Sequence, residues 1–138
     1  MINQSVVVPM MKPGEMGLGD FLDEIKAIGF AAVEFWGRDD DFEETVEAAR
    51  ARDLRVASFV GHEHASETGE GHAEAFSRPH NHDRLEAELR ESIDIAAKYN
   101  IPGLITLAGH RNPGQSDYEA LWVCAEGLRR ITPYAEEK

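Results

Sequence analysis

The sequence predicts an α/β fold in which parallel strands alternate with helices. Four short apolar runs, at residues 5–10, 31–36, 55–60 and 103–107, are each bounded by turn or polar residues. Runs that are apolar on both faces suit a parallel sheet covered by helices, and a helical pattern follows each run. Because strand–helix units of this kind normally close as eight, we predict one incomplete domain over residues 1–138 that holds the first four units of a (β/α)8 TIM barrel, a half-barrel.

The first two predicted helices have clear start and stop signals. Asp20 is the expected N-cap of the first helix, and Gly29 supplies its C-terminal stop. The second helix begins at Asp41, with Glu44 three residues later as a carboxylate variant of the capping box. Helical spacing predicts that these two helices bury Phe21, Leu22, Ile25 and Ile28, and Phe42, Val46 and Ala49.

The third and fourth helices are predicted from similar signals. The third covers residues 83–98, and Asn100, which tolerates left-handed backbone, ends it. The fourth opens with Ser116 and Glu119 as a capping box, and Pro133 should kink or shorten its last turn. The expected inward stripes are Leu85, Leu89, Ile93 and Ala96 in the third helix, and Leu121, Trp122, Ala125, Leu128 and Ile131 in the fourth.

Composition restricts the partners. The chain has 138 residues and a formal net charge of −12, whereas nucleic acid and anionic lipid are bound through Lys and Arg, and no segment is long and apolar enough to span a membrane. The one cysteine, Cys124, is expected to be buried in a protein of the reducing cytoplasm. A half-barrel exposes two strand edges and an apolar inner face, so we expect a homo-oligomer or a missing C-terminal half after Lys138.

Histidines follow the third and fourth predicted strands, at the rim where barrel enzymes place their chemistry. His62 and His64 lie nearest the end of the third strand and alternate around Glu63, a spacing that can chelate a metal ion or contact a substrate. His110 follows the fourth strand on the same rim. The other histidines of the long segment after the third strand, His72, His80 and His82, are interpreted as solvated.

Three further residues near strand ends are candidates for a site. Arg111 could clamp a carboxylate or phosphate, or only pair with an acidic neighbour on the surface. Trp36 could wall a substrate pocket or belong to the core, and Glu34, inside an apolar strand, is interpreted as half of an interior ion pair. The predicted substrate-binding residues are therefore His62, His64, His110, Arg111 and Trp36, and no catalytic residue or metal ligand is assigned.

Four stretches of this chain resemble the hydroxypyruvate isomerase branch of the xylose isomerase-like TIM barrels, a sugar isomerase and epimerase superfamily. They are IGFAAVEFW at 28–36, VASFVGHEH at 56–64, SRPHNHDRLEAELRESIDIAAKYNIPGL at 77–104 and AGHRNPGQSDYEAL at 108–121. A fifth, EGLRRITPYAEEK, covers 126–138. The resemblance extends over essentially the whole chain, and RPHNHDR and GQSDYE are its most specific parts.

The resemblance implies an aldose–ketose type isomerisation of a sugar or small hydroxy-carbonyl compound, such as hydroxypyruvate to tartronate semialdehyde. A divalent metal (Mg, Mn or Zn) would polarise the carbonyl while two glutamates move the proton. In that family the metal ligands and both glutamates lie on strands five to eight, so this chain alone is expected to be inactive and to supply one wall of the substrate pocket. His110 departs from the family, in which asparagine is common at this position.

Two other interpretations remain open. Endonuclease IV-like barrels bind zinc through histidines after strands three and four, which His62 or His64 with His110 resembles, although the acidic charge weighs against DNA as a substrate. The chain could also be a non-catalytic half-barrel that associates with itself. No glycine-rich phosphate loop, nucleophile elbow or C-x-x-C pair is present in the sequence, which gives nucleotide-dependent, serine-hydrolase and thiol-redox functions no local support.

Overall fold

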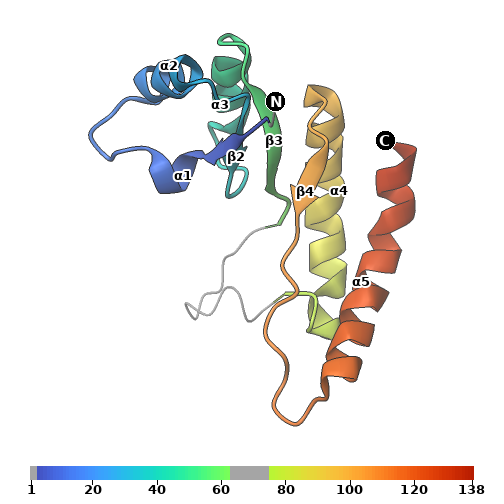
Figure 1. The fold of residues 1–138 in the computed structure, drawn as a ribbon. Helices are drawn as coiled ribbons and strands as arrows, with labels where there is room; N and C mark the ends of the chain where they lie inside the picture. Colours follow the sequence, from blue (N-terminus) through green and yellow to red (C-terminus); the bar gives the residue numbers. More distant parts are fainter. Residues whose placement is uncertain (1–2, 63–74) are drawn as a thin grey trace. The chain divides into compact units, whose positions relative to one another are not determined.

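A computed structural model describes residues 3–62 and 75–138, and it has the mixed α/β fold that the sequence predicts (Figure 1). The chain divides into two compact units, which are described separately. The first unit contains Met1–Val60 and Ala96–Ile105, and the second contains Gly61–Ile95 and Thr106–Lys138.

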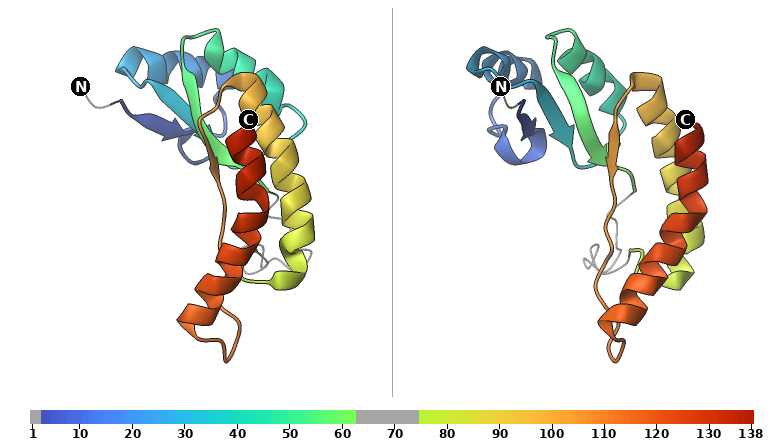
Figure 2. Two further views of the ribbon diagram at one scale, coloured as in Figure 1. Left: turned by 90° about the vertical axis from the view of Figure 1, so that its right-hand side faces the viewer. Right: turned by 45° about the vertical axis from the view of Figure 1, so that its right-hand side comes forward.

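A four-stranded, fully parallel sheet forms the centre of the first unit. Its strands are β1 (Ser5–Val7), β2 (Ala32–Phe35), β3 (Arg55–Val60) and β4 (Gly103–Ile105), and they pair in the order β1-β2-β3-β4 (Figure 2). Helices connect the successive strands, so the predicted alternation of parallel strands and helices is confirmed. This sequential order is what the first half of a closed parallel barrel requires.

Three of the predicted strands are shorter than expected, and the second, β2, loses only one residue at each end. The first ends at Val7 and continues as the short helix α1 (Val8–Met11), because Pro9 cannot donate to a strand ladder but fits the first turn of a helix. The fourth ends at Ile105, whose partner Val60 is the last residue of β3, so no neighbouring strand remains for the next residues to pair with.

Helix α2 (Leu18–Ile28) confirms the predicted stop but not the predicted start. Gly29 follows it with φ +108°, a left-handed conformation that glycine adopts without steric cost. The N-cap is Gly17, and the expected cap Asp20 lies instead within the first turn, where a carboxylate favours the positive end of the helix dipole. Ile28, expected inside, is 73% exposed.

Helix α3 (Phe42–Arg50) packs on one face of the sheet through its first residue. The ring of Phe42 lies 5.9 Å from that of Phe35 and 4.7 Å from that of Phe59. Its predicted inward stripe of Phe42, Val46 and Ala49 is confirmed, since all three are buried. Asp41 does occupy the N-cap position, but its backbone is not extended and its side chain makes no cap hydrogen bond, so the predicted carboxylate capping box is not formed.

Helix α4 (His82–Tyr99) follows a single turn of 3-10 helix at Pro79–Asn81 and matches its prediction closely. Asn100 ends it with φ +53°, the left-handed conformation expected for that residue. The predicted stripe is buried as a whole, namely Leu85, Leu89, Ile93 and Ala96.

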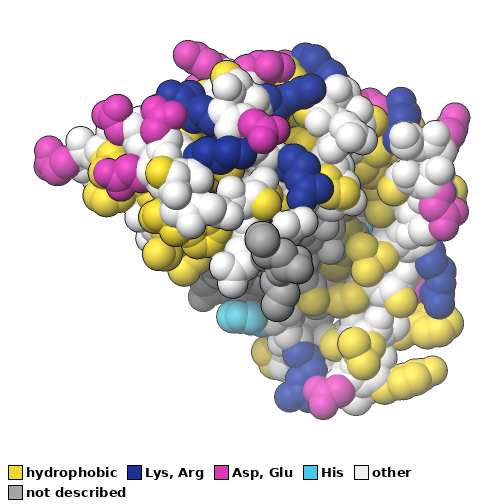
Figure 3. Space-filling model, turned by 45° about the horizontal axis from the view of Figure 1, so that its top comes forward, with side chains coloured by type: hydrophobic (Ala, Val, Ile, Leu, Met, Phe, Trp, Pro, Cys, Tyr) yellow, Lys and Arg dark blue, Asp and Glu magenta, His cyan; other side chains and the backbone are white. Residues whose placement is uncertain are grey.

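Helix α5 (Asp117–Glu137) has the predicted start but a different buried face. Ser116 and Glu119 form the capping box, and the helix continues through Pro133, which therefore does not shorten it. The predicted inward residues Leu121 and Trp122 are 70% and 51% exposed, and Leu128 is also exposed, whereas Ile131 is buried as predicted. Figure 3 shows hydrophobic side chains (yellow) along the lower part of this helix.

In the second unit, α5 packs through a different face than expected, because Gly127 lets the helix approach Phe76 and His82 closely. A Cβ atom at Gly127 would lie 2.5 Å from Cδ1 of Phe76 and 2.9 Å from Nε2 of His82. Gly127, Phe76 and His82 are all buried. Among the described helices, none is long and apolar enough to cross a membrane.

Candidate functional site

His62 is a buried residue just after the C-terminal end of β3. Its Nε2 atom accepts a hydrogen bond from the backbone N–H of Leu107 at 3.0 Å, and its ring meets that of Phe76 edge-on at 6.2 Å. A backbone amide can only donate, so Nε2 carries no proton in this arrangement and Nδ1 holds the hydrogen of the neutral ring. His62 therefore fixes the start of the loop that follows β4.

Ser77 holds the same loop at three points. Its N–H donates to the carbonyl of Ala108 at 2.6 Å, and its hydroxyl donates to the carbonyl of His110 at 2.7 Å. The carbonyl of Ser77 accepts from the side-chain amide of Asn112 at 3.3 Å. Gly109 has φ +82°, and a Cβ atom there would lie 2.8 Å from the Ser77 hydroxyl, so this close approach requires glycine.

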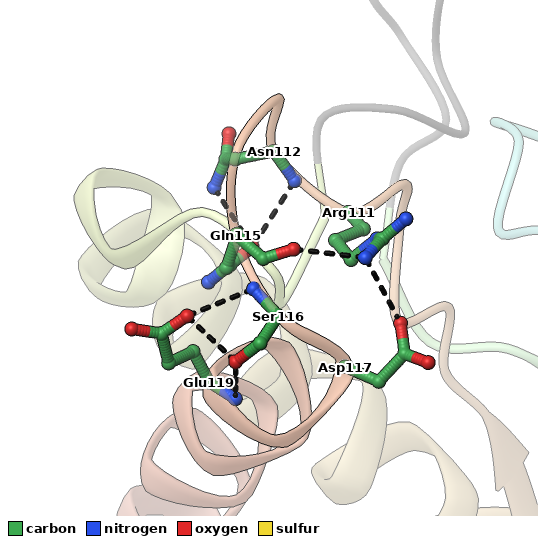
Figure 4. A network of polar contacts seen from close by, with 6 residues as sticks. All are labelled: Arg111, Asn112, Gln115, Ser116, Asp117 and Glu119. Carbon is green, nitrogen blue, oxygen red and sulfur yellow. Dashed lines mark hydrogen bonds and ion pairs between the residues drawn. The ribbon is translucent and has the colours of Figure 1, made fainter.

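The predicted site residues His110 and Arg111 lie on this anchored loop with exposed side chains. The Arg111 guanidinium donates to the carbonyl of Gln115 at 2.9 Å and pairs with Asp117 at 3.2 Å (Figure 4). Of the two roles considered for Arg111, the structure shows the surface ion pair. Because this pair is exposed, it leaves the guanidinium accessible to a competing anion.

The turn after Arg111 is closed by side-chain amides and by the capping box of α5. The side-chain oxygen of Gln115 accepts from both the backbone N–H and the side-chain amide of Asn112, at 3.1 and 3.3 Å (Figure 4). Ser116 donates to Glu119 through its N–H and its hydroxyl, and these two bonds hold the pKa of Glu119 below its ordinary value. The loop from residue 106 to residue 116 is thus positioned by polar contacts to its backbone.

A shallow pocket of about 540 Å³ lies beside this network. Its lining includes Gln115, Glu119 and the exposed aromatic side chains of Tyr118 and Trp122. The Trp122 ring is covered on one side by the guanidinium of Arg129, 4.8 Å from the ring centroid. The second unit therefore presents amide, carboxylate and aromatic groups together.

Trp36 and Glu34 belong to the first unit. Trp36 follows β2 directly and is 51% exposed, so it is not a core aromatic, and its role as a pocket wall stays a prediction. Glu34 accepts hydrogen bonds from the hydroxyls of Ser5 and Ser58, on the strands either side of β2. The expected interior ion pair is not found among the described residues, and the carboxylate is held by neutral donors instead. Since Phe35 faces α3, Glu34 points to the opposite face of the sheet.

The remaining predicted histidines divide into three cases. His64 and His72 lie outside the described residues. His80 is exposed, as predicted. His82 was expected to be solvated, but it is buried and its Nε2 donates to the carbonyl of Phe76 at 2.9 Å. A ring packed under α5 is removed from water, and the carbonyl of Phe76 accepts from its N–H.

The described residues offer no ready metal centre. No group of three or more His, Cys, Asp or Glu side chains that could hold a metal ion occurs among residues 3–62 and 75–138. Cys124, expected to be fully buried, is half-buried, with its Sγ 3.8 Å from the carbonyl of Ala108. Partial burial raises the pKa of its thiol, so the reactive thiolate is disfavoured.

The residues that sequence reasoning missed are those that shape the loop. Ser77, Asn112 and Gln115 carry no motif of their own, although the Asn-Pro-Gly run at 112–114 is a turn signal and Gly114 does adopt φ +80°.

In comparisons with known proteins, no family model matches the chain and no curated protein matches it.

Proposed function

We propose that this chain supplies the first four βα units of a barrel of the xylose isomerase-like superfamily, and that it forms one wall of the pocket in which a small hydroxy-carbonyl compound is isomerised. The observation that carries the proposal is the fully parallel sheet in the order β1-β2-β3-β4, with helices between successive strands. The stretches RPHNHDR and GQSDYE support the hydroxypyruvate isomerase branch of that superfamily.

In the second unit, the side chains suited to contact such a substrate are those of His110 and Arg111, on the loop after β4. In the first unit, taken by itself, the suited side chain is that of the exposed Trp36, after β2. An imidazole can donate to a hydroxyl or carbonyl oxygen, and a guanidinium can bind a carboxylate through two N–H groups. His110 and Arg111 are exposed on a loop that contacts with Ser77 and Gln115 hold in place. The backbone that carries the two side chains is therefore positioned without a ligand.

A divalent metal would polarise the substrate in this class of reaction. The described residues do not fit that group, because they contain no cluster of three potential ligands. No chemical step is therefore assigned to the described residues, and their expected contribution is binding.

Each unit also has surface that a partner would cover. Ile105, on the edge strand β4, is 37% exposed, and α5 exposes Leu121 and Trp122. In a barrel, the next strand would pair with β4 and the next helix would pack on α5. We therefore propose that the chain works together with a second half-barrel, which is either further sequence or a second copy.

The test is a titration of the isotope-labelled chain with hydroxypyruvate, followed by NMR. We expect amide signals from residues 107–112 to shift, with a dissociation constant in the range of about 1 mM or weaker because only one wall is present. Replacing Arg111 by Gln should remove most of the response, whereas replacing Arg129 by Gln, which removes one exposed guanidinium elsewhere on the second unit, should not.

Turnover is measured in the same samples with Mg²⁺, Mn²⁺ or Zn²⁺. We expect no conversion of hydroxypyruvate by the chain alone. Conversion would contradict the assignment of the catalytic groups to a second half-barrel, and unchanged spectra throughout the titration would contradict the proposed pocket wall.

A further inference from the structure

A pocket of about 560 Å³ lies in the first unit at the end of the sheet where β3 and β4 begin. Its floor is apolar and fully formed, because Val46, Leu54 and Val56 line it and are 1%, 1% and 6% exposed. Because the four strands are parallel, this end of the sheet is opposite to the one where β2 ends at Phe35, just before Trp36. The pocket is therefore separate from the rim discussed above.

Two arginines stand at this pocket without an acidic partner. Arg50 comes from the last turn of α3 and Arg55 is the first residue of β3. Among the described residues, neither makes an ion pair. Examples of guanidiniums that do are those of Arg52, Arg84, Arg90, Arg111, Arg129 and Arg130. In a chain with a net charge of −12, two uncompensated guanidiniums in one pocket are unexpected.

Two acidic groups at or next to the pocket, Asp53 and Glu43, are already compensated. Asp53 lines it, but its carboxylate pairs with Lys26 at 3.0 Å. Glu43 pairs with Lys98 and accepts a hydrogen bond from the hydroxyl of Tyr99, and these bonds lower the pKa of Glu43. The Tyr99 ring, which also lines the pocket, has the Arg50 guanidinium 5.9 Å from its centroid. The pocket thus retains an excess of positive charge.

We propose that this pocket binds a phosphorylated small molecule. Its phosphate lies between Arg50 and Arg55, and its carbon portion covers the apolar floor at Val46 and Leu54. A phosphate ester carries close to two negative charges at neutral pH, which matches two guanidiniums, and the guanidinium fork fits phosphate oxygens. The volume falls in the range of small-molecule sites. Binding here does not depend on the function proposed for the opposite rim.

Phenyl phosphate is the probe, because it combines a phosphate with an apolar ring. Its binding to the whole chain is measured by calorimetry and NMR at constant ionic strength, so that general screening is the same in every sample. We expect saturable binding that shifts amide signals of residues 50–57 and 99–102. Replacing either Arg50 or Arg55 by Gln should weaken binding about tenfold or more, the loss expected for one charge-assisted contact.

The matched control is Arg129→Gln, which removes one exposed guanidinium from the second unit and should leave binding unchanged. Arg50→Lys keeps the charge but not the fork, and should give an intermediate affinity. Circular dichroism confirms that each variant is folded, which is expected because both arginine side chains are exposed. Benzoate serves as the comparison ligand and should bind more weakly than phenyl phosphate.

Three results would overturn the proposal. The first is absence of saturable binding of phenyl phosphate up to about 10 mM, a concentration that would detect even millimolar affinity. The second is equal weakening by Arg129→Gln, which would indicate general charge attraction. The third is benzoate binding as tightly as phenyl phosphate. The hydroxypyruvate experiment is judged from the signals of residues 107–112, and this one from those of residues 50–57 and 99–102, so the two proposals can fail independently.

Discussion

Replacing Gly127 by alanine is expected to destabilise the chain, even though alanine is the better helix former. Gly127 lies inside α5, where the exchange by itself would gain about 1 kcal/mol in helix propensity. The new methyl group, however, would lie 2.5 Å from Cδ1 of Phe76, whereas carbon atoms pack best at about 3.5–4.0 Å. The contact must therefore be relieved by movement of a neighbour.

Neither neighbour can move cheaply. Phe76 is 2% exposed and His82 is 7% exposed, and the ring nitrogen of His82 that bonds the carbonyl of Phe76 is itself 2.9 Å from the added atom. Overpacking of a filled core costs about 1–3 kcal/mol, and disturbing the hydrogen bond about 1 kcal/mol more. After subtraction of the gain in propensity, Gly127→Ala should lower the free energy of unfolding by about 1–3 kcal/mol.

The assay is urea unfolding followed by circular dichroism at 222 nm. The matched control is Gly19→Ala in α2, where the added atom meets only the flexible end of Arg52, so this variant should be neutral or stabilised. A double-mutant cycle with Phe76→Leu tests the cause, because Gly127→Ala should cost less once the ring is gone. If Gly127→Ala proved as stable as the original chain, the close approach of α5 to Phe76 would be refuted.

Three other predictions follow from single contacts. Ser116→Ala should cost about 1 kcal/mol in urea unfolding, because it removes the cap of α5. The folded state lowers the pKa of the Glu119 carboxyl, so the original chain should be more stable than Glu119→Gln at pH 7. This advantage should disappear as the pH falls below about 4. Glu34→Gln should cost about 1 kcal/mol, because an amide cannot accept at both of the positions used by Ser5 and Ser58. The control Glu24→Gln, at an exposed position, should cost nothing measurable. Equal stability of the two variants would show that the serine bonds contribute nothing. Cys124 should react with iodoacetamide at pH 8 more slowly than free glutathione, since partial burial raises its pKa, and an equal rate would contradict that burial.

Local signals in the sequence were enough to predict the elements whose ends depend on nearby residues. The capping box at Ser116 and Glu119 spans three residues, and the left-handed stops at Gly29 and Asn100 depend only on the preceding helix. The alternation of strands and helices is equally local, because it follows from hydrophobic spacing within each segment. The parallel sheet could therefore be predicted before any contact was known.

Features that depend on a distant partner could not be predicted. The donors to Glu34 lie 29 and 24 residues away, and nothing near Glu34 distinguishes two serines from a buried cation. The buried face of α5 is set by Gly127, which has no side chain and so no place in a hydrophobic stripe. The sequence around His82 predicts a solvated loop histidine, and its burial depends on the contact with Phe76, which the sequence pattern does not reveal.

The candidate site differs from these cases because its backbone and its exposed side chains are determined by different residues. Ser77 donates to the carbonyls of Ala108 and His110. Gln115 accepts from the Arg111 guanidinium through its carbonyl, and from the two amides of Asn112 through its side chain. The imidazole of His110 takes no part in that network among the described residues, so evolution can exchange it without moving the loop. An exchange between asparagine and histidine here would alter what the loop donates to a ligand while leaving its position unchanged. An exchange at His110 therefore changes the side chain that the loop exposes at little cost in stability.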